Sequence, residues 1–258
     1  MSAFFIVRFL TLMRYFNLEK QFLTYLFLIV FAATTVAQEN VTTFGIFYKP
    51  VVPMKALDND EITGEVNQTA FTITPKVSHS FGMVIRRGFT KSLSLETGIN
   101  YITRKYDLTI TDLDSSFSGT SNFRFIGYEI PLQGLVYIRL GEQLYMNAST
   151  GVSLDFYPSD IATGEPYFFH QTLRNGWIQT AFLSNVGFEL RTRKSGYYYL
   201  GDSFHRPFKA IAGTDVLYKG NNHNDIFSTS LNGNYFTIDL RYFFHEDPER
   251  KSKTKKKK

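Results

Sequence analysis

Apolar and small polar side chains alternate from Leu144 to Tyr157. The even positions carry leucine, methionine, alanine, threonine, valine and phenylalanine, and the odd positions carry mainly serine, asparagine, glycine, aspartate and tyrosine. Successive side chains of a β-strand point to opposite faces, so this segment predicts a strand between two different environments. The same two-residue period recurs along the chain and favours an all-β protein.

Eight segments are predicted as strands, at about 42–51, 76–87, 92–110, 122–140, 143–157, 177–192, 196–208 and 234–244. The connections at 88–91, 141–142 and 193–195 are short enough for tight hairpins. They alternate with four longer connections, at 52–75, 111–121, 158–176 and 209–233. Membrane barrels have an even strand count, short turns at one end and long loops at the other. The pattern therefore predicts an eight-stranded antiparallel up-and-down transmembrane β-barrel with both termini in the periplasm.

The fourth predicted strand has an irregular phase. Its apolar positions change from Phe123 and Phe125 to Ile126, Tyr128 and Ile130. We expect a β-bulge near Phe125, because an extra residue in one strand would exchange its two faces.

Alternation by itself does not say which face points outward. A soluble lipocalin-like barrel also has eight strands, but its apolar side chains point inward. Here the polar face carries small and neutral residues with scattered charges, which suits a narrow enclosed lumen. The other face is rich in Phe, Leu, Ile and Tyr, as lipid contact and aromatic girdles require. We therefore expect the apolar face to contact lipid, with the soluble ligand-binding barrel as an alternative.

The polar face also carries charges of both signs. An eight-stranded barrel is just wide enough to be filled by side chains, and a buried charge is costly unless it is paired. We expect a packed lumen crossed by ion pairs, with one or two arginines near strand ends facing water. The predicted network comprises Arg86, Glu96, Glu129, Arg139, Asp155, Glu189, Arg191, Asp239 and Arg241.

The two ends of the chain carry net charges of +2 and +4, so the middle, at −1, is near neutral although the whole chain is +5. The segment 1–37 has basic residues, an apolar core and a small-residue exit, which is typical of a secretory signal peptide; its start is Met1 or Met13. The barrel domain then spans 38–244. The Lys-rich segment 245–258 predicts a disordered basic periplasmic tail. We expect it either to contact anionic headgroups, peptidoglycan or an acidic protein, or to be a solvated tail without a partner. The body lacks a basic patch, so nucleic acid is not an expected partner.

The stretch Tyr128-Glu129-Ile130-Pro131-Leu132 resembles the small outer-membrane β-barrel (porin-like, PorT-type) proteins of the Bacteroidetes. The signal end at Val36 to Gln38, the segment SLSLETGINY from Ser92 and the segment YFTIDLRYFF from Tyr235 agree with it. The resemblance covers roughly the whole mature chain. It implies insertion by the barrel-assembly machinery, which reads the last strand through Phe236, Ile238, Leu240, Tyr242 and Phe244. Unlike the usual family ending, this chain continues to Lys258.

Some members of that family serve secretion or gliding, and no catalytic residues carry over from it. An outer-membrane enzyme acting on lipid or peptide at the outer rim is the alternative, and it needs a histidine beside a nucleophile or a carboxylate. Of the five histidines, His170 and the His223–Asp225 pair lie in long connections, where we expect them to be solvated. We expect no metal, cofactor or catalytic site. The favoured function is a non-enzymatic outer-membrane protein that binds a partner in an envelope or secretion complex.

Overall fold

The computed structural model describes residues 41–53, 61–90, 92–115, 117–192, 194–220 and 223–245. The predicted signal peptide at 1–37 lies outside the described residues, as does the predicted tail beyond His245. Within the described ranges, no helix is long and apolar enough to span a membrane.

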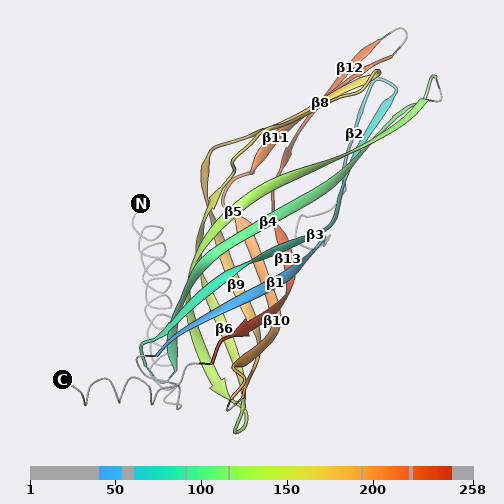
Figure 1. The fold of residues 1–258 in the computed structure, drawn as a ribbon. Helices are drawn as coiled ribbons and strands as arrows, with labels where there is room; N and C mark the ends of the chain where they lie inside the picture. The colour runs from blue at the N-terminus through green and yellow to red at the C-terminus, as the bar shows by residue number, and fades with distance from the viewer. Residues whose placement is uncertain are drawn as a thin grey trace, which may run out of the picture. The chain divides into compact units, whose positions relative to one another are not determined.

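Eight strands form a closed antiparallel barrel (Figure 1). In chain order around the wall they are β1 (Thr42–Val52), β3 (Thr69–Gly88), β4 (Leu93–Asp112), β5 (Phe117–Arg139), β6 (Leu144–Phe156), β9 (Ile178–Arg191), β10 (Tyr197–Pro207) and β13 (Tyr235–Phe243). β13 pairs with β1, and β1 pairs with β3 from Thr42↔Arg87 to Val51↔Ser78, which closes the ring. The predicted barrel and all eight predicted strands are confirmed.

The barrel has two different ends. The short hairpins between β3 and β4, β5 and β6, and β9 and β10 lie at one end, which we call the turn end. At the other end, β3, β4 and β5 run on past the barrel wall (Figure 1). There they join β2 (Ile62–Val66), which pairs with the first residues of β3.

The predicted long connections also contain four further strands. β7 (Ile161–Gly164), β8 (Phe168–Arg174), β11 (Ala212–Lys219) and β12 (Asn224–Leu231) form a second sheet in the order β12-β11-β8-β7. This sheet packs against the continuations of β3, β4 and β5 around an apolar core that includes Phe71, Leu108, Phe125, Phe168 and Val216. We call this two-sheet region the extension.

The predicted bulge near Phe125 is wrong. The register of β4 with β5 stays the same from Leu93↔Val136 to Asp112↔Phe117. The odd positions of β5 point inward throughout, from Phe123 in the extension to Tyr137 in the barrel. What changes along the strand is the polarity of the interior, so the apolar side chains are on the inside in one region and on the outside in the other. The register shift that does occur is in β3, between Lys76 and His79.

The outer wall of the barrel is a continuous apolar surface. Leu132, for example, is 50% exposed although it is a leucine in the middle of a paired strand. Aromatic rings border this surface at both of its edges, toward the extension and at the turn end. Phe81, Tyr101 and Tyr128 are cross-strand neighbours toward the extension, and Phe44 stacks on Phe244 at the turn end. An apolar band between two aromatic girdles is the exterior that a lipid bilayer requires.

Candidate functional site

The barrel interior is crossed by a chain of alternating charges. Arg86 on β3 donates to Glu96 Oε2 through Nε at 3.1 Å and through Nη2 at 3.0 Å. Its third nitrogen, Nη1, donates to Glu189 Oε2 on the opposite wall, at 2.5 Å. Glu189 also accepts from Arg191 Nε at 2.6 Å. Arg86, Glu96 and Glu189 are all buried, so each charge depends on the others for compensation.

This series of alternating charges continues through the other carboxylate oxygen of Glu96. Arg241 Nη1 on β13 donates to Glu96 Oε1, and the same guanidinium donates to Asp239 Oδ2 through Nη2, both at 2.5 Å. Lys49 on β1 is the last charge in this series, and its Nζ lies 3.2 Å from Asp239 Oδ2. The interior cavity beside Lys49 and Glu96 has a volume of about 20 Å³, enough for about one water molecule.

Eight of the nine residues of the predicted lumen network point into this interior, and Arg139 does not. Arg139 is exposed at the end of β5, where its Nε donates to the Gly141 carbonyl at 2.8 Å. The strand end places its side chain beyond the enclosed lumen, so no buried carboxylate is needed to pair with it. The sequence reasoning missed Lys49, Arg104 and His205. Arg104 shares the even parity of Glu96 and Asn100 on the same strand, a signal that could have placed it inside.

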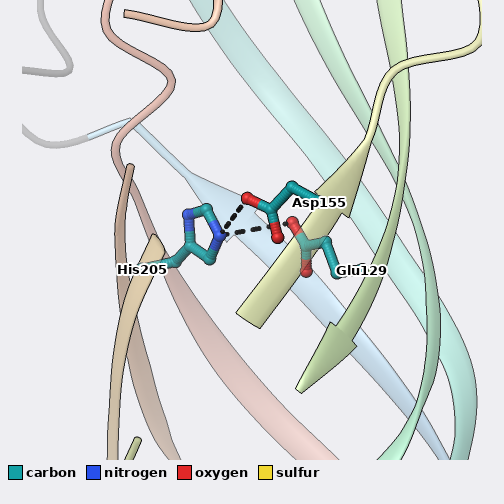
Figure 2. A group of neighbouring side chains, drawn as sticks. All are labelled: Glu129, Asp155 and His205. Carbon is teal, nitrogen blue, oxygen red and sulfur yellow. Dashed lines mark hydrogen bonds and ion pairs between the residues drawn. The ribbon is translucent and has the colours of Figure 1, made fainter. Parts of the chain in front are cut away.

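A second buried cluster is formed by residues of three barrel strands (Figure 2). Glu129 on β5, Asp155 on β6 and His205 on β10 point toward one another, and each is at most 1% exposed. His205 Nε2 lies 2.9 Å from Asp155 Oδ2 and 3.7 Å from Glu129 Oε1. Arg104 Nη2 donates to Glu129 Oε1 at 3.3 Å, and Tyr235 Oη donates to Glu129 Oε2 at 2.8 Å.

Ser153, Asp155 and His205 have the residue types of a serine hydrolase triad but not its geometry. Ser153 Oγ donates to Asp155 Oδ1 at 2.5 Å and lies 3.4 Å from His205 Nε2. In a triad, the carboxylate holds one ring nitrogen and the serine uses the other. Here both partners contact the same nitrogen, and Nδ1 has no partner among the described residues. The serine is also buried in the barrel, where a peptide or lipid would not reach it.

Polar side chains in the extension tie its two sheets together. Asp225 on β12 accepts from Asn67 Nδ2 at 2.5 Å and from Thr69 Oγ1 at 2.7 Å, both at the β2–β3 turn. Asp112 at the end of β4 accepts from Tyr218 Oη of β11 at 3.0 Å. The Ser115 hydroxyl and the backbone N–H groups of Asp114 and Ser115 also donate to Asp112 and lower its pKa to about 2.

The prediction that His170, His223 and Asp225 are solvated loop residues is wrong for two of the three. Asp225 is fully buried, where it accepts the hydrogen bonds from Asn67 and Thr69, and His223 Nε2 lies 3.2 Å from its Oδ2. His170 is buried in the apolar core against the Phe123 ring, with its Nε2 2.9 Å from Thr172 Oγ1. Burial lowers the pKa of His170 to about 4. His223 keeps a side chain that is 26% exposed.

The residues predicted to form the barrel-assembly signal share one face of β13. The side chains of Phe236, Ile238, Leu240, Tyr242 and Phe244 all lie on the outward parity of the strand, while Thr237, Asp239, Arg241 and Phe243 are buried inside. Tyr242 contacts both Tyr198 and Phe244 within the turn-end girdle. Recognition by an assembly machinery is a separate property and stays a prediction.

A closed antiparallel barrel with an apolar exterior, aromatic girdles and a charged interior defines a transmembrane β-barrel of the outer-membrane type. The same exterior excludes the lipocalin-like alternative, in which apolar side chains line the inside.

No protein-family model matches this chain. No curated protein matches it either. Among solved structures, it is similar to the outer membrane protein OprG from Pseudomonas aeruginosa, with 12% identity and a TM-score of 0.48 over 82% of this chain and 100% of that one. It is also similar to the outer membrane protease OmpT from Escherichia coli, with 11% identity and a TM-score of 0.33 over 79% of this chain and 96% of the other. The β-domain of the Bordetella autotransporter BrkA gives 11% identity and a TM-score of 0.25 over 81% and 100%. Sequence identities and TM-scores this low carry no argument about the function of this chain.

Proposed function

We propose that this protein is a non-enzymatic integral outer-membrane protein whose extension is a rigid binding platform on the cell surface. The ordered packing of the extension carries this proposal. Its two sheets share one aromatic core, and the core lies directly above the charged lumen. Such a platform can present a fixed surface without a large ordering cost on binding.

The proposed orientation places the turn end, with the ends of β1 and β13, in the periplasm. Long structured segments on the outer side and short turns on the inner side are typical of bacterial outer-membrane barrels. The basic tail would then meet periplasmic partners, and the extension would meet ligands outside the cell. Membership of the PorT-type family, export by a signal peptide and a role in an envelope or secretion complex belong to this proposal.

A passive pore is less consistent with the interior. The charge chain links opposite walls of the barrel through Arg86 and Glu189, and the apolar core of the extension lies above it. Catalysis at the outer rim is also poorly supported. The Thr69 hydroxyl lies 3.4 Å from His223 Nε2, but it donates to Asp225 at 2.7 Å, and that carboxylate contacts the same ring nitrogen instead of the other one. We therefore favour binding over transport or hydrolysis.

Single-cysteine labelling tests the orientation directly, since the chain has no cysteine of its own. Ser230→Cys lies on the exposed face of β12, and Ser195→Cys lies in the exposed turn between β9 and β10. A membrane-impermeant maleimide should label Ser230→Cys in intact cells and Ser195→Cys only after lysis. The reverse pattern would overturn the orientation, and recovery of the protein in the soluble periplasm would overturn the membrane assignment.

Binding of a partner to the exposed face of the second sheet, where Ser230 lies, can be tested with the same cysteine variant. The outer face of the second sheet carries a cross-strand apolar row of Phe169, Leu217 and Ile226. Crosslinking from Ser230→Cys should capture a specific envelope or surface partner, and Ile226→Asp should abolish that capture without changing heat-dependent mobility on a gel. Identical capture by the Ile226→Asp protein would argue against the platform function.

A further inference from the structure

Three side chains with metal-binding chemistry converge inside the barrel, and the function proposed above does not use them. Glu129, Asp155 and His205 come from three different strands, and one ligand atom of each lies within 4.8 Å of the other two (Figure 2). We propose that this cluster binds a single divalent transition-metal ion of the Zn²⁺ class.

The spacing of the ligand atoms fits such an ion. A tetrahedral Zn²⁺ with ligand bonds of about 2.0–2.1 Å separates its ligand atoms by roughly 3.3 Å. His205 Nε2 lies 2.9 Å from Asp155 Oδ2 and 3.7 Å from Glu129 Oε1, which brackets that value. Ser153 Oγ, at 3.4 Å from the same nitrogen, is the nearest neutral donor for a fourth position. All three ligand atoms lie within 4.8 Å of one another, so side-chain movement is needed to bring every pair to this separation.

The types of ligand choose between classes of ion. Ca²⁺ and Mg²⁺ prefer shells made of oxygen atoms alone, whereas imidazole nitrogen suits Zn²⁺ and its first-row neighbours. One imidazole and two carboxylates therefore favour a transition metal. Burial of all three side chains would also limit competition from bulk water.

Unpartnered polar atoms beside the cluster indicate that it also holds solvent. Arg104 is 4% exposed, yet its Nε and Nη1 have no hydrogen-bond partner among the described residues. The same is true of His205 Nδ1, whose ring stacks on Tyr235 at 4.4 Å. Because buried donors are normally satisfied, these atoms indicate that acceptors such as water molecules lie beside the cluster, while the metal itself would be held by Nε2 and the carboxylates.

Arg104 makes the proposal unusually easy to test, because it competes with the ion. Its guanidinium lies 3.3 Å from Glu129 Oε1, the same oxygen that would bind the metal. Two carboxylates, one guanidinium and one divalent ion leave a net positive charge in a buried site, which lowers the affinity. Removing the guanidinium should therefore tighten metal binding, whereas removing a ligand should weaken it.

The experiment uses the full chain, refolded in detergent with a chelator and then desalted. Zn²⁺ is titrated by calorimetry, and Co²⁺ absorption reports the coordination geometry. We expect about one Zn²⁺ per chain, with a tetrahedral Co²⁺ spectrum. His205→Gln should weaken Zn²⁺ binding at least about tenfold, and Arg104→Gln should tighten it roughly tenfold.

His170→Gln is the matched control, because His170 is equally buried but contacts an aromatic ring and a hydroxyl. This variant should bind Zn²⁺ like the wild type. If His205→Gln does not refold, Asp155→Asn replaces it, since asparagine keeps the shape but removes the charge. Absence of stoichiometric Zn²⁺ in the refolded wild type would overturn the proposal. Equal affinity in the His205→Gln or Asp155→Asn protein would also overturn it, as would weaker binding after Arg104→Gln.

Discussion

The barrel and the extension are made partly of the same strands, but their insides have opposite chemistry. On β4, the inward positions carry Glu96 and Asn100 within the barrel and Leu108 and Ile110 within the extension. The register with β5 does not change between them. Backbone geometry therefore decides which side chains face inward, and the surrounding solvent decides which polarity the sequence needs there. In lipid the apolar side chains face out, and in water they face in.

The largest expected effect comes from breaking the charge chain of the barrel. Asp239→Ala should lower the free energy of unfolding by about 3–5 kcal/mol, because it leaves the buried cations of Lys49 and Arg241 without their shared partner. Urea unfolding in lipid vesicles, followed by the mobility of the folded form, measures this change. Asp215→Ala on the exposed face of β11 is the control and should change the same quantity by less than about 0.5 kcal/mol. Equal effects would mean that the lumen network is not stabilising.

A cavity in the core of the extension should have an effect almost as large. Phe125 is fully buried and packs against Tyr157, with ring centroids 5.3 Å apart. Phe125→Ala should cost about 3–4 kcal/mol, since it removes apolar burial and leaves a void. Phe188→Ala on the lipid-facing wall should cost less, because lipid chains fill the vacated space. Limited proteolysis of the extension and vesicle unfolding together distinguish local from global loss, and a larger effect at Phe188 would contradict the comparison.

A charge added to the outer surface should have very different stability costs on the barrel and on the extension. Leu132→Arg in the middle of the apolar band should destabilise the folded barrel by about 2–4 kcal/mol, the cost of arginine near the bilayer midplane. Ile226→Arg on the extension, where the native side chain is 61% exposed, should cost less than about 0.5 kcal/mol. Both variants are compared with wild type for their folded fraction in vesicles. Similar costs at the two positions would mean that they face the same solvent.

The smallest expected effects are pH responses confined to the extension, first from His170 and then from Asp112. The folded pKa of His170 is about 4, below the usual unfolded value of about 6.5. The unfolded state therefore binds more protons between these values, and stability contributed by neutral His170 falls as the pH decreases from about 6.5 to 4. Protease cleavage within the extension should increase over this window. His170→Gln should show a flatter profile, whereas an unchanged profile would assign the response to another group.

Asp112 should protect the extension at still lower pH. Its pKa of about 2 is depressed, so the stability contributed by its carboxylate is present above the unfolded pKa and is lost as the pH falls toward 2. Asp112→Asn should remove the part of the acid sensitivity that lies between about pH 4 and pH 2. The protease assay that serves for His170 can measure this difference.

Much of the barrel was readable from local pattern, because each strand alternates against two uniform environments. The eight strands, their turns and the inward parity of Glu96, Glu129 and Asp239 follow from sequence alone. The extension was not readable in the same way. Its inward residues on β8, such as Phe168 and His170, become a core only when they meet residues far away in the chain. The incorrect bulge at Phe125 arose from equating an apolar side chain with an outward one.

The cluster of Glu129, Asp155 and His205 could not be predicted from the local sequence pattern either. Asp155 and Glu129 were identified as inward charges, but His205 lies on the strand with the least regular alternation, and its partners are about 50 residues or more distant in sequence. Convergence of three strands on one point depends on barrel closure and shear, which a single strand does not encode.

The constant register of β4 with β5 has a consequence for how this protein can evolve. The part of the extension made by β3, β4 and β5 continues the barrel strands and cannot be exchanged as a separate module, whereas β7, β8, β11 and β12 lie in connections between barrel strands. On these strands, an insertion would have to be absorbed by a bulge, as happens between Lys76 and His79 of β3, or it would exchange the inward and outward faces of the other region as well.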